Sequence, residues 1–128
     1  MKNNTKNVDL EKENSNDFCT SLPVILLDDK GYPTEEYLKF IREFTPKTMP
    51  VIDFVVGVLQ NGWYSEEWGF KLGRKYKGIR KLELHTGGWS GNEEIISAIK
   101  SNFYLTHFNM KYVKWYRGGH FYFEIPVE

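Results

Sequence analysis

The segment His85-Thr86-Gly87-Gly88-Trp89-Ser90-Gly91-Asn92-Glu93-Glu94 joins a strand-like run to a helix-like run, and the other elements can be placed around it. Residues 80–86 alternate apolar and polar side chains, as a half-buried strand does. Residues 92–101 carry apolar side chains at helical spacing. Glycines at 87 and 88 can adopt positive φ angles, so the chain can turn sharply between the two elements. The segment therefore predicts a strand–turn–helix unit.

Ser90 and Glu93 have the spacing of a capping box, in which each side chain accepts a hydrogen bond from the other residue's backbone N–H. The free N–H groups at a helix start also carry partial positive charge, which suits an anionic ligand. Two interpretations are open: an elbow that binds an anion, or a well-capped helix that Trp89 anchors to the core. The segment is neither a dinucleotide-binding fingerprint nor a phosphate-binding P-loop.

Composition limits the class of protein. The 128 residues fit one domain, and contents of 41% hydrophobic and 16% aromatic residues suffice for a core. The formal net charge is zero, so any affinity for nucleic acid or membrane would have to be local. Cys19 is the only cysteine, which excludes a disulfide within the chain and a cysteine-based zinc site. With no signal-like or membrane-spanning apolar run, we expect a reduced, cytoplasmic protein without membrane association.

The N-terminal residues 1–20 are mostly Asn, Lys, Glu and Asp, which predicts a disordered tail. Residues 21–128 then form a single domain; the alternative for the tail is an arm that orders on a partner. Residues 22–27 are apolar and can form a short strand. Thr34 is the expected N-cap of a helix that Pro46 closes, and residues 51–60 form a second helix, apolar nearly all round and therefore buried.

Residues 70–81 are rich in lysine, arginine and glycine, and they predict a hairpin or an extended edge segment leading into the strand at 80–86. Their cations could contact phosphates. Lysine-rich edges also keep sheets from aggregating, and the sequence leaves both interpretations open.

A C-terminal β-hairpin is predicted from residues 111–125, with Gly118-Gly119 as a two-residue turn. This register places the pairs Arg117–His120, Trp115–Tyr122 and Val113–Glu124 on an open face. It places the pairs Tyr116–Phe121, Lys114–Phe123 and Tyr112–Ile125 toward the core. The expected fold is α+β, with three helices packed on a small antiparallel sheet that includes this hairpin.

The block Thr86–Glu93, followed by Arg117-Gly118-Gly119-His120 and an aromatic strand, resembles a small family of uncharacterised phage and prophage proteins. The resemblance covers roughly the last 50 residues. It implies a phage or mobile-element setting and indicates no biochemical reaction. Small proteins in that setting often bind a host factor, a nucleotide or a nucleic acid.

We expect the protein to act by binding. Its partner is either a host protein, with inhibition of a host defence system as the role, or a nucleotide or nucleic acid. The expected site lies where the elbow meets the hairpin tip, and comprises Thr86, Gly88, Trp89, Ser90, Asn92, Trp115, Arg117, His120 and Tyr122. The alternative is a nucleotide- or nucleic-acid-processing enzyme with Glu93 and His120 as acid and base.

No metal or cofactor is expected. The three histidines, at positions 85, 107 and 120, do not have a recognised metal-ligand spacing. Ser90 does not stand in the G-x-S-x-G motif of a nucleophile elbow.

Overall fold

The computed structural model describes residues 25–127 and shows an α+β fold, as predicted. Its four strands form one antiparallel sheet in the order β1-β2-β4-β3. The strands are β1 (Phe70–Leu72), β2 (Ile79–His85), β3 (Lys111–Tyr116) and β4 (His120–Pro126). The helices are α1 (Glu35–Glu43), α2 (Val51–Asp53) continuing into the π-helical η4 (Phe54–Leu59), α3 (Glu66–Gly69), α4 (Ser90–Lys100) and the π-helical η5 (Leu105–Asn109).

The three predicted helices are α1, α2–η4 and α4, and the short α3 and η5 are additional. The predicted hairpin is formed by β3 and β4. The tail predicted for residues 1–20 lies outside the described residues. Of the strand predicted at 22–27, the described part contains only an isolated bridge between Leu27 and Pro33.

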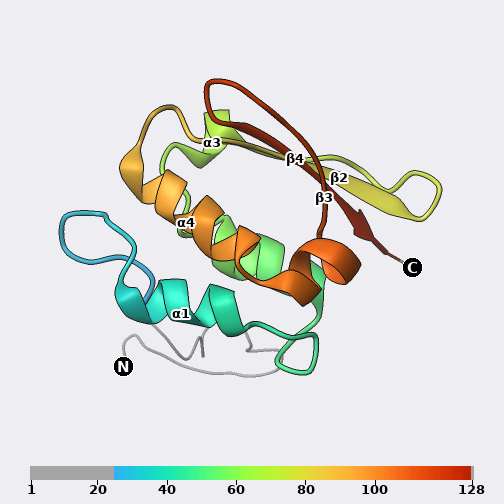
Figure 1. Cartoon of the computed structure of the whole chain (residues 1–128), viewed down its shortest axis with the longest axis horizontal. Helices are drawn as coiled ribbons and strands as arrows, with labels where there is room; N and C mark the ends of the chain where they lie inside the picture. Colours follow the sequence, from blue (N-terminus) through green and yellow to red (C-terminus); the bar gives the residue numbers. More distant parts are fainter. Residues whose placement is uncertain (1–24, 128) are drawn as a thin grey trace.

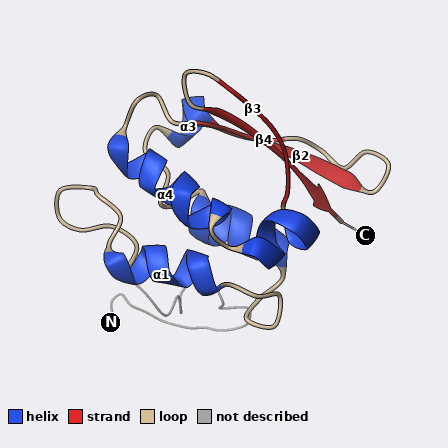
Figure 2. Cartoon of the chain, in the orientation of Figure 1, coloured by secondary structure: helices blue, strands red, loops and turns tan. Residues whose placement is uncertain are grey.

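The helices lie on one side of the sheet (Figures 1 and 2). Strand residues that face them, such as Leu82, Leu84 and Phe123, are almost fully buried and form the core with the helices. Within residues 25–127 the helices α1, η4 and α4 leave the opposite side uncovered, and α3 reaches it only at His85, through Trp68. We call this side the open face. By strand alternation and register, its residues are Lys71, Ile79, Lys81, Glu83, His85, Lys111, Lys114, Tyr116, His120, Tyr122, Glu124 and Pro126.

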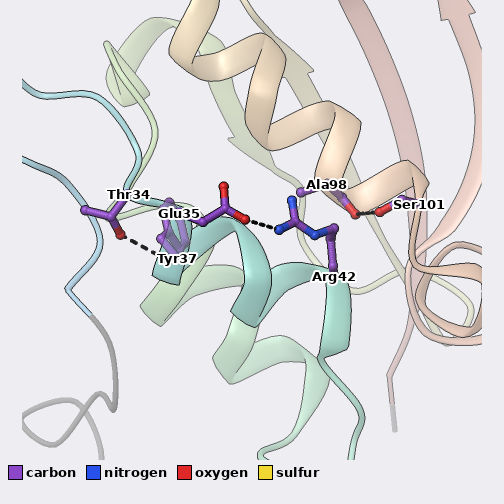
Figure 3. Close-up of polar contacts among 6 residues, drawn as sticks. All are labelled: Thr34, Glu35, Tyr37, Arg42, Ala98 and Ser101. Carbon is purple, nitrogen blue, oxygen red and sulfur yellow. Dashed lines mark hydrogen bonds and ion pairs between the residues drawn. The ribbon is translucent and has the colours of Figure 1, made fainter.

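Helix α1 begins where the sequence predicts. The Thr34 side chain accepts a hydrogen bond from the Tyr37 N–H at 3.0 Å, and Arg42 pairs with Glu35 on the exposed side (Figure 3). The Tyr37 phenol is buried and donates to the Val58 carbonyl at 3.0 Å. Burial disfavours its charged form and raises the pKa of Tyr37.

The helix formed by α2 and η4 is less completely buried than its sequence predicts. Phe54, Val55, Val58 and Leu59 face the core, but Val56 is 40% exposed. None of the helices within residues 25–127 combines the length and apolarity that crossing a bilayer requires.

The hairpin register differs from the prediction. Arg117 joins Gly118 and Gly119 in a three-residue turn, and the two glycines have φ angles of +92° and +81°. The observed pairs are Tyr116–His120, Trp115–Phe121, Lys114–Tyr122, Tyr112–Phe123 and Lys111–Glu124, with a bulge between Tyr112 and Lys114.

A one-residue shift moves every side chain of a strand to the other face. The side chains of β4 lie on the faces that were predicted. The predicted faces of residues 114–116 in β3 were wrong, because the longer turn shifts these residues by one position. Tyr116 and Lys114 lie on the open face, and Trp115 lies on the helix side. The bulge restores the predicted core-side position of Tyr112.

Candidate functional site

The structure brings together the start of the elbow and the hairpin tip. The Thr86 N–H donates to the Gly119 carbonyl at 2.9 Å. Thr86 is buried, and a Cβ added to Gly119 would lie 2.1 Å from the Thr86 hydroxyl oxygen. The two glycine-rich blocks are therefore in direct contact, and this contact requires a glycine at position 119.

The elbow itself is a tight turn closed by a 3.0 Å hydrogen bond from the Trp89 N–H to the Thr86 carbonyl. Gly87 and Gly88, its two central residues, have φ angles of +64° and +76°, as a type I′ turn requires. The predicted role of these glycines is confirmed.

The predicted capping box is absent. Trp89 occupies the N-cap position of α4 without a side-chain cap, and Ser90 is the exposed first residue of the helix. The Glu93 N–H donates to the Trp89 carbonyl at 3.1 Å, where a capping box would direct it to the serine hydroxyl. The prediction was wrong because α4 starts one residue earlier than the Ser-x-x-Glu spacing implies.

Asn92 has a structural role. Its side chain is buried, accepts from the Tyr64 N–H at 3.0 Å and donates to the Tyr64 carbonyl at 3.1 Å. Its amide also lies 3.4 Å from the Thr86 carbonyl. The amide group therefore fastens the loop before α3 to the elbow, and its hydrogen bonds are directed to the backbone.

Trp89 is enclosed by two other rings. Its centroid lies 4.8 Å from that of Tyr32 and 4.6 Å from that of Tyr64, with interplanar angles of 17° and 27°. The indole therefore stacks with two rings of the protein itself, and its role as a stacking surface for a ligand stays a prediction. A hollow of about 210 Å³ adjoins the indole, lined by Tyr64, Ser65, Trp68, Thr86, Gly87 and Trp89.

The open face carries a chain of polar contacts beside the hairpin tip. His85 and His120 are cross-strand partners, and their Nδ1 atoms are 2.8 Å apart. Nε2 of His85 lies 3.3 Å from a carboxylate oxygen of Glu83. The His85 side chain is only 12% exposed, and the ring of Trp68 lies 5.9 Å away from it.

Aromatic rings and a lysine lie next to these contacts among Glu83, His85 and His120. Nζ of Lys114 lies 5.1 Å from the ring centroid of Tyr122 and 5.5 Å from that of Tyr116. The Tyr122 ring is edge-on to Tyr116 at 5.6 Å and to His85 at 6.0 Å. Together with Glu83 and His120, these four side chains form one continuous group on the sheet.

Two hollows continue along the same surface and share Lys81 and Glu124. One holds about 210 Å³ and is lined by Lys81, Leu82, Glu83, Val113, Lys114, Tyr122, Phe123 and Glu124. The other holds about 370 Å³ and is lined by Gly73, Arg74, Tyr76, Lys77, Ile79, Lys81 and Glu124. Together they form a track from the hairpin to the β1–β2 loop.

The charge along this track is positive although the whole chain is neutral. The open face has lysines at 71, 81, 111 and 114 against glutamates at 83 and 124. The β1–β2 loop adds Arg74, Lys75 and Lys77, with no acidic residue between 73 and 78.

The predicted site residues thus divide into separate groups. His120 and Tyr122 lie on the open face, with Arg117 exposed at the adjoining turn; Gly88 and Ser90 are exposed at the elbow. Trp115 lies on the helix side of the sheet. Glu93 is exposed on α4, and no hydrogen bond or ion pair of the described residues joins it to His120.

Five residues of this group and track were not predicted as site residues from the sequence: Lys81, Glu83, His85, Lys114 and Tyr116. The alternation within 80–86 already placed Lys81, Glu83 and His85 on one face, but it could not show which strand lies beside them. In the part of the chain that the structure describes, no three His, Cys, Asp or Glu side chains are grouped to hold a metal ion.

Comparison of the chain with protein-family models, with curated proteins and with solved structures finds no match.

Proposed function

We propose that this protein acts by binding, and that its ligand is a single-stranded nucleic acid held on the open face of the sheet. The observation that carries the proposal is the combination of exposed aromatic rings and clustered lysines on a sheet face that α1, η4 and α4 leave uncovered.

The aromatic residues provide surfaces for bases. Tyr116 is 53% exposed on the open face, and Tyr76 is 71% exposed beside the second hollow. Stacking of a base on an aromatic side chain contributes about 1–3 kcal/mol and tolerates any sequence. Unpaired bases are free to stack in this way, whereas bases in a duplex are already stacked on one another.

The lysines and arginines provide contacts for phosphates. Nζ of Lys114 lies over the rings of Tyr116 and Tyr122, so a base that stacks on the exposed part of Tyr116 would have its phosphate near an ammonium group. Lys81, Arg74 and Lys77 line the rest of the track. Alternating rings and cations are the usual composition of a surface that binds single strands.

A matched pair of variants tests which face binds. Trp115 and Tyr116 are neighbours on β3 with 52% and 53% exposure, but they point to opposite sides of the sheet. With fluorescein-labelled oligouridylate and oligodeoxyuridylate dodecamers, we expect Tyr116→Ala to weaken binding about ten-fold or more, as loss of a stacked base implies. Trp115→Ala should bind like the wild type. Equal losses in the two variants, or no binding by the wild-type protein, would refute the proposal.

A second pair tests the phosphate contact. Lys114→Gln removes a cation of the open face, and Lys39→Gln removes an exposed cation of α1 on the helical side. Each phosphate contact to a single strand contributes about 0.7 to the slope of log affinity against log salt concentration. Lys114→Gln should lower the slope by about this amount, and Lys39→Gln should leave it unchanged.

A second candidate function is binding to a host protein, in the phage setting that the sequence resemblance implies, as an inhibitor of a host system. It is favoured by three exposed rings around η5: Phe103, Tyr104 and Phe108 are each at least 60% exposed. Such a cluster suits an apolar groove on a partner protein.

A pull-down from bacterial lysate separates the two candidates. A protein that stays bound after nuclease treatment, is retained by Tyr116→Ala and is lost with a Phe103→Ser/Phe108→Ser variant supports the second candidate. Material that nuclease releases supports the first.

A further inference from the structure

The contacts among Glu83, His85 and His120 determine where the two imidazole protons lie. An ionised carboxylate only accepts hydrogen bonds, so the 3.3 Å contact with Glu83 places a proton on Nε2 of His85. A neutral imidazole carries one proton, which leaves Nδ1 of His85 as an acceptor. The 2.8 Å contact between the Nδ1 atoms then requires the proton of His120 to be on its Nδ1.

It follows that Nε2 of neutral His120 carries a lone pair and no proton. In the described residues this nitrogen has no hydrogen-bond partner, and it lies beside the glycines of the hairpin turn, 3.2 Å from the ideal Cβ position of Gly118. Glu83 and His85 act as positioning residues. They determine which nitrogen of His120 carries the proton, and Nε2 of His120 is the atom that is available to a ligand.

We propose that Nε2 of His120 accepts a hydrogen bond from a ribose 2′-hydroxyl, so that the open face prefers RNA to DNA. This inference rests on the proposed binding of single-stranded nucleic acid. His120 pairs across the strands with Tyr116 and is two residues from Tyr122. A base stacked on one of these rings, with its phosphate near Lys114, brings its sugar to the hairpin end of the face.

The preference for RNA follows from Nε2 of His120 being an acceptor. A bare imidazole nitrogen cannot bond to a phosphate oxygen, because both are acceptors. The 2′-hydroxyl is a donor that deoxyribose lacks, and it is the group by which proteins distinguish RNA from DNA. Without the Glu83 contact, His120 could instead carry its proton on Nε2 and would then present a donor.

The tautomers can be tested without any ligand. Long-range ¹H–¹⁵N NMR spectra of the imidazoles at about pH 8, where an ordinary imidazole is neutral, should show the proton of His120 on Nδ1 and that of His85 on Nε2. In Glu83→Gln the amide can donate as well as accept, so the two tautomers should shift toward the opposite assignment. A wild-type His120 with its proton on Nε2 would overturn the inference.

The sugar preference is tested with three dodecamers of uridylate: ribose, deoxyribose and 2′-O-methyl. One hydrogen bond should make the ribose form bind about three- to ten-fold more tightly than either of the others. The 2′-O-methyl form keeps a ribose-like sugar without the donor, so it separates hydrogen bonding from sugar shape. His120→Ala should remove the preference, and His107→Ala, a change to an exposed histidine of η5, should retain it.

The outcomes distinguish the ribose contact from single-strand binding itself. Equal binding of the three dodecamers by the wild-type protein would overturn the ribose contact and leave single-strand binding standing. Failure of all three to bind would overturn both. A preference that survives in His120→Ala would also overturn the contact, because the discrimination would then arise elsewhere on the face.

Discussion

The backbone N–H of Thr86 is hydrogen-bonded to the carbonyl oxygen of Gly119 across 2.9 Å. This bond extends the pairing of β2 with β4 one residue beyond the pair His85–His120. It joins the elbow after β2 to the turn before β4, and thereby holds His120 in place at the end of the open face. The contact is so close that a side chain at position 119 would overlap the Thr86 hydroxyl.

Gly119→Ala is expected to destabilise the protein more than Gly88→Ala. Both glycines have positive φ, +81° and +76°, so each alanine meets a strain of about 1–2 kcal/mol. Only the Cβ at position 119 meets another group, which adds about 1–3 kcal/mol of overpacking. Urea unfolding of both variants measures the difference. Equal losses would show that the contact with Thr86 relaxes without cost.

Ser90→Ala should change the free energy of unfolding by less than about 0.5 kcal/mol, because Ser90 is exposed and does not cap α4. Asn92→Ala should cost about 1–3 kcal/mol, since it removes the hydrogen bonds by which the buried Asn92 amide holds the backbone N–H and carbonyl of Tyr64. Thermal and urea unfolding of the two variants provide the comparison. A large loss in Ser90→Ala would restore the capping role that the Ser-x-x-Glu spacing suggests.

Tyr37 should make the protein sensitive to alkaline pH. Burial raises the pKa of Tyr37, so the folded protein keeps a proton that the unfolded chain loses near pH 10. The contribution of Tyr37 to the free energy of unfolding is therefore constant below about pH 10 and decreases as the pH rises further. Tyr37→Phe should cost about 1 kcal/mol at neutral pH by removing the hydrogen bond to Val58, and the cost should shrink above about pH 10. A cost that is constant with pH would contradict this assignment.

Arg117→Ala should leave stability within about 0.5 kcal/mol, because Arg117 is exposed in the hairpin turn. The arginine lies directly beside the open face, so its loss should weaken oligonucleotide binding and reduce the salt dependence of binding. Anisotropy titrations at several salt concentrations, together with thermal unfolding, separate the two effects. Loss of stability without any change in binding would show that Arg117 supports the turn and does not contact the ligand.

Elements with local signals can be predicted from the residues alone. Thr34 and the acidic residues after it specify the start of α1, and alternation in 80–86 specifies both faces of β2. The glycines at 87, 88, 118 and 119 indicate tight turns, and all four adopt positive φ. Neighbouring residues decide these features, because backbone conformation and periodicity are properties of a few consecutive positions.

How these elements pack together depends on contacts between residues far apart in the sequence. No local pattern indicates that β2 lies beside β4. This pairing places His85 opposite His120 and so connects the Glu83–His85 contact to His120. The three-residue turn likewise exchanges the faces of Trp115 and Tyr116, and the bulge in β3 returns Tyr112 to its predicted face. The choice of neighbouring strand and of register depends on packing between residues far apart in sequence, and a shift of one residue reverses which side chains the sheet presents to solvent.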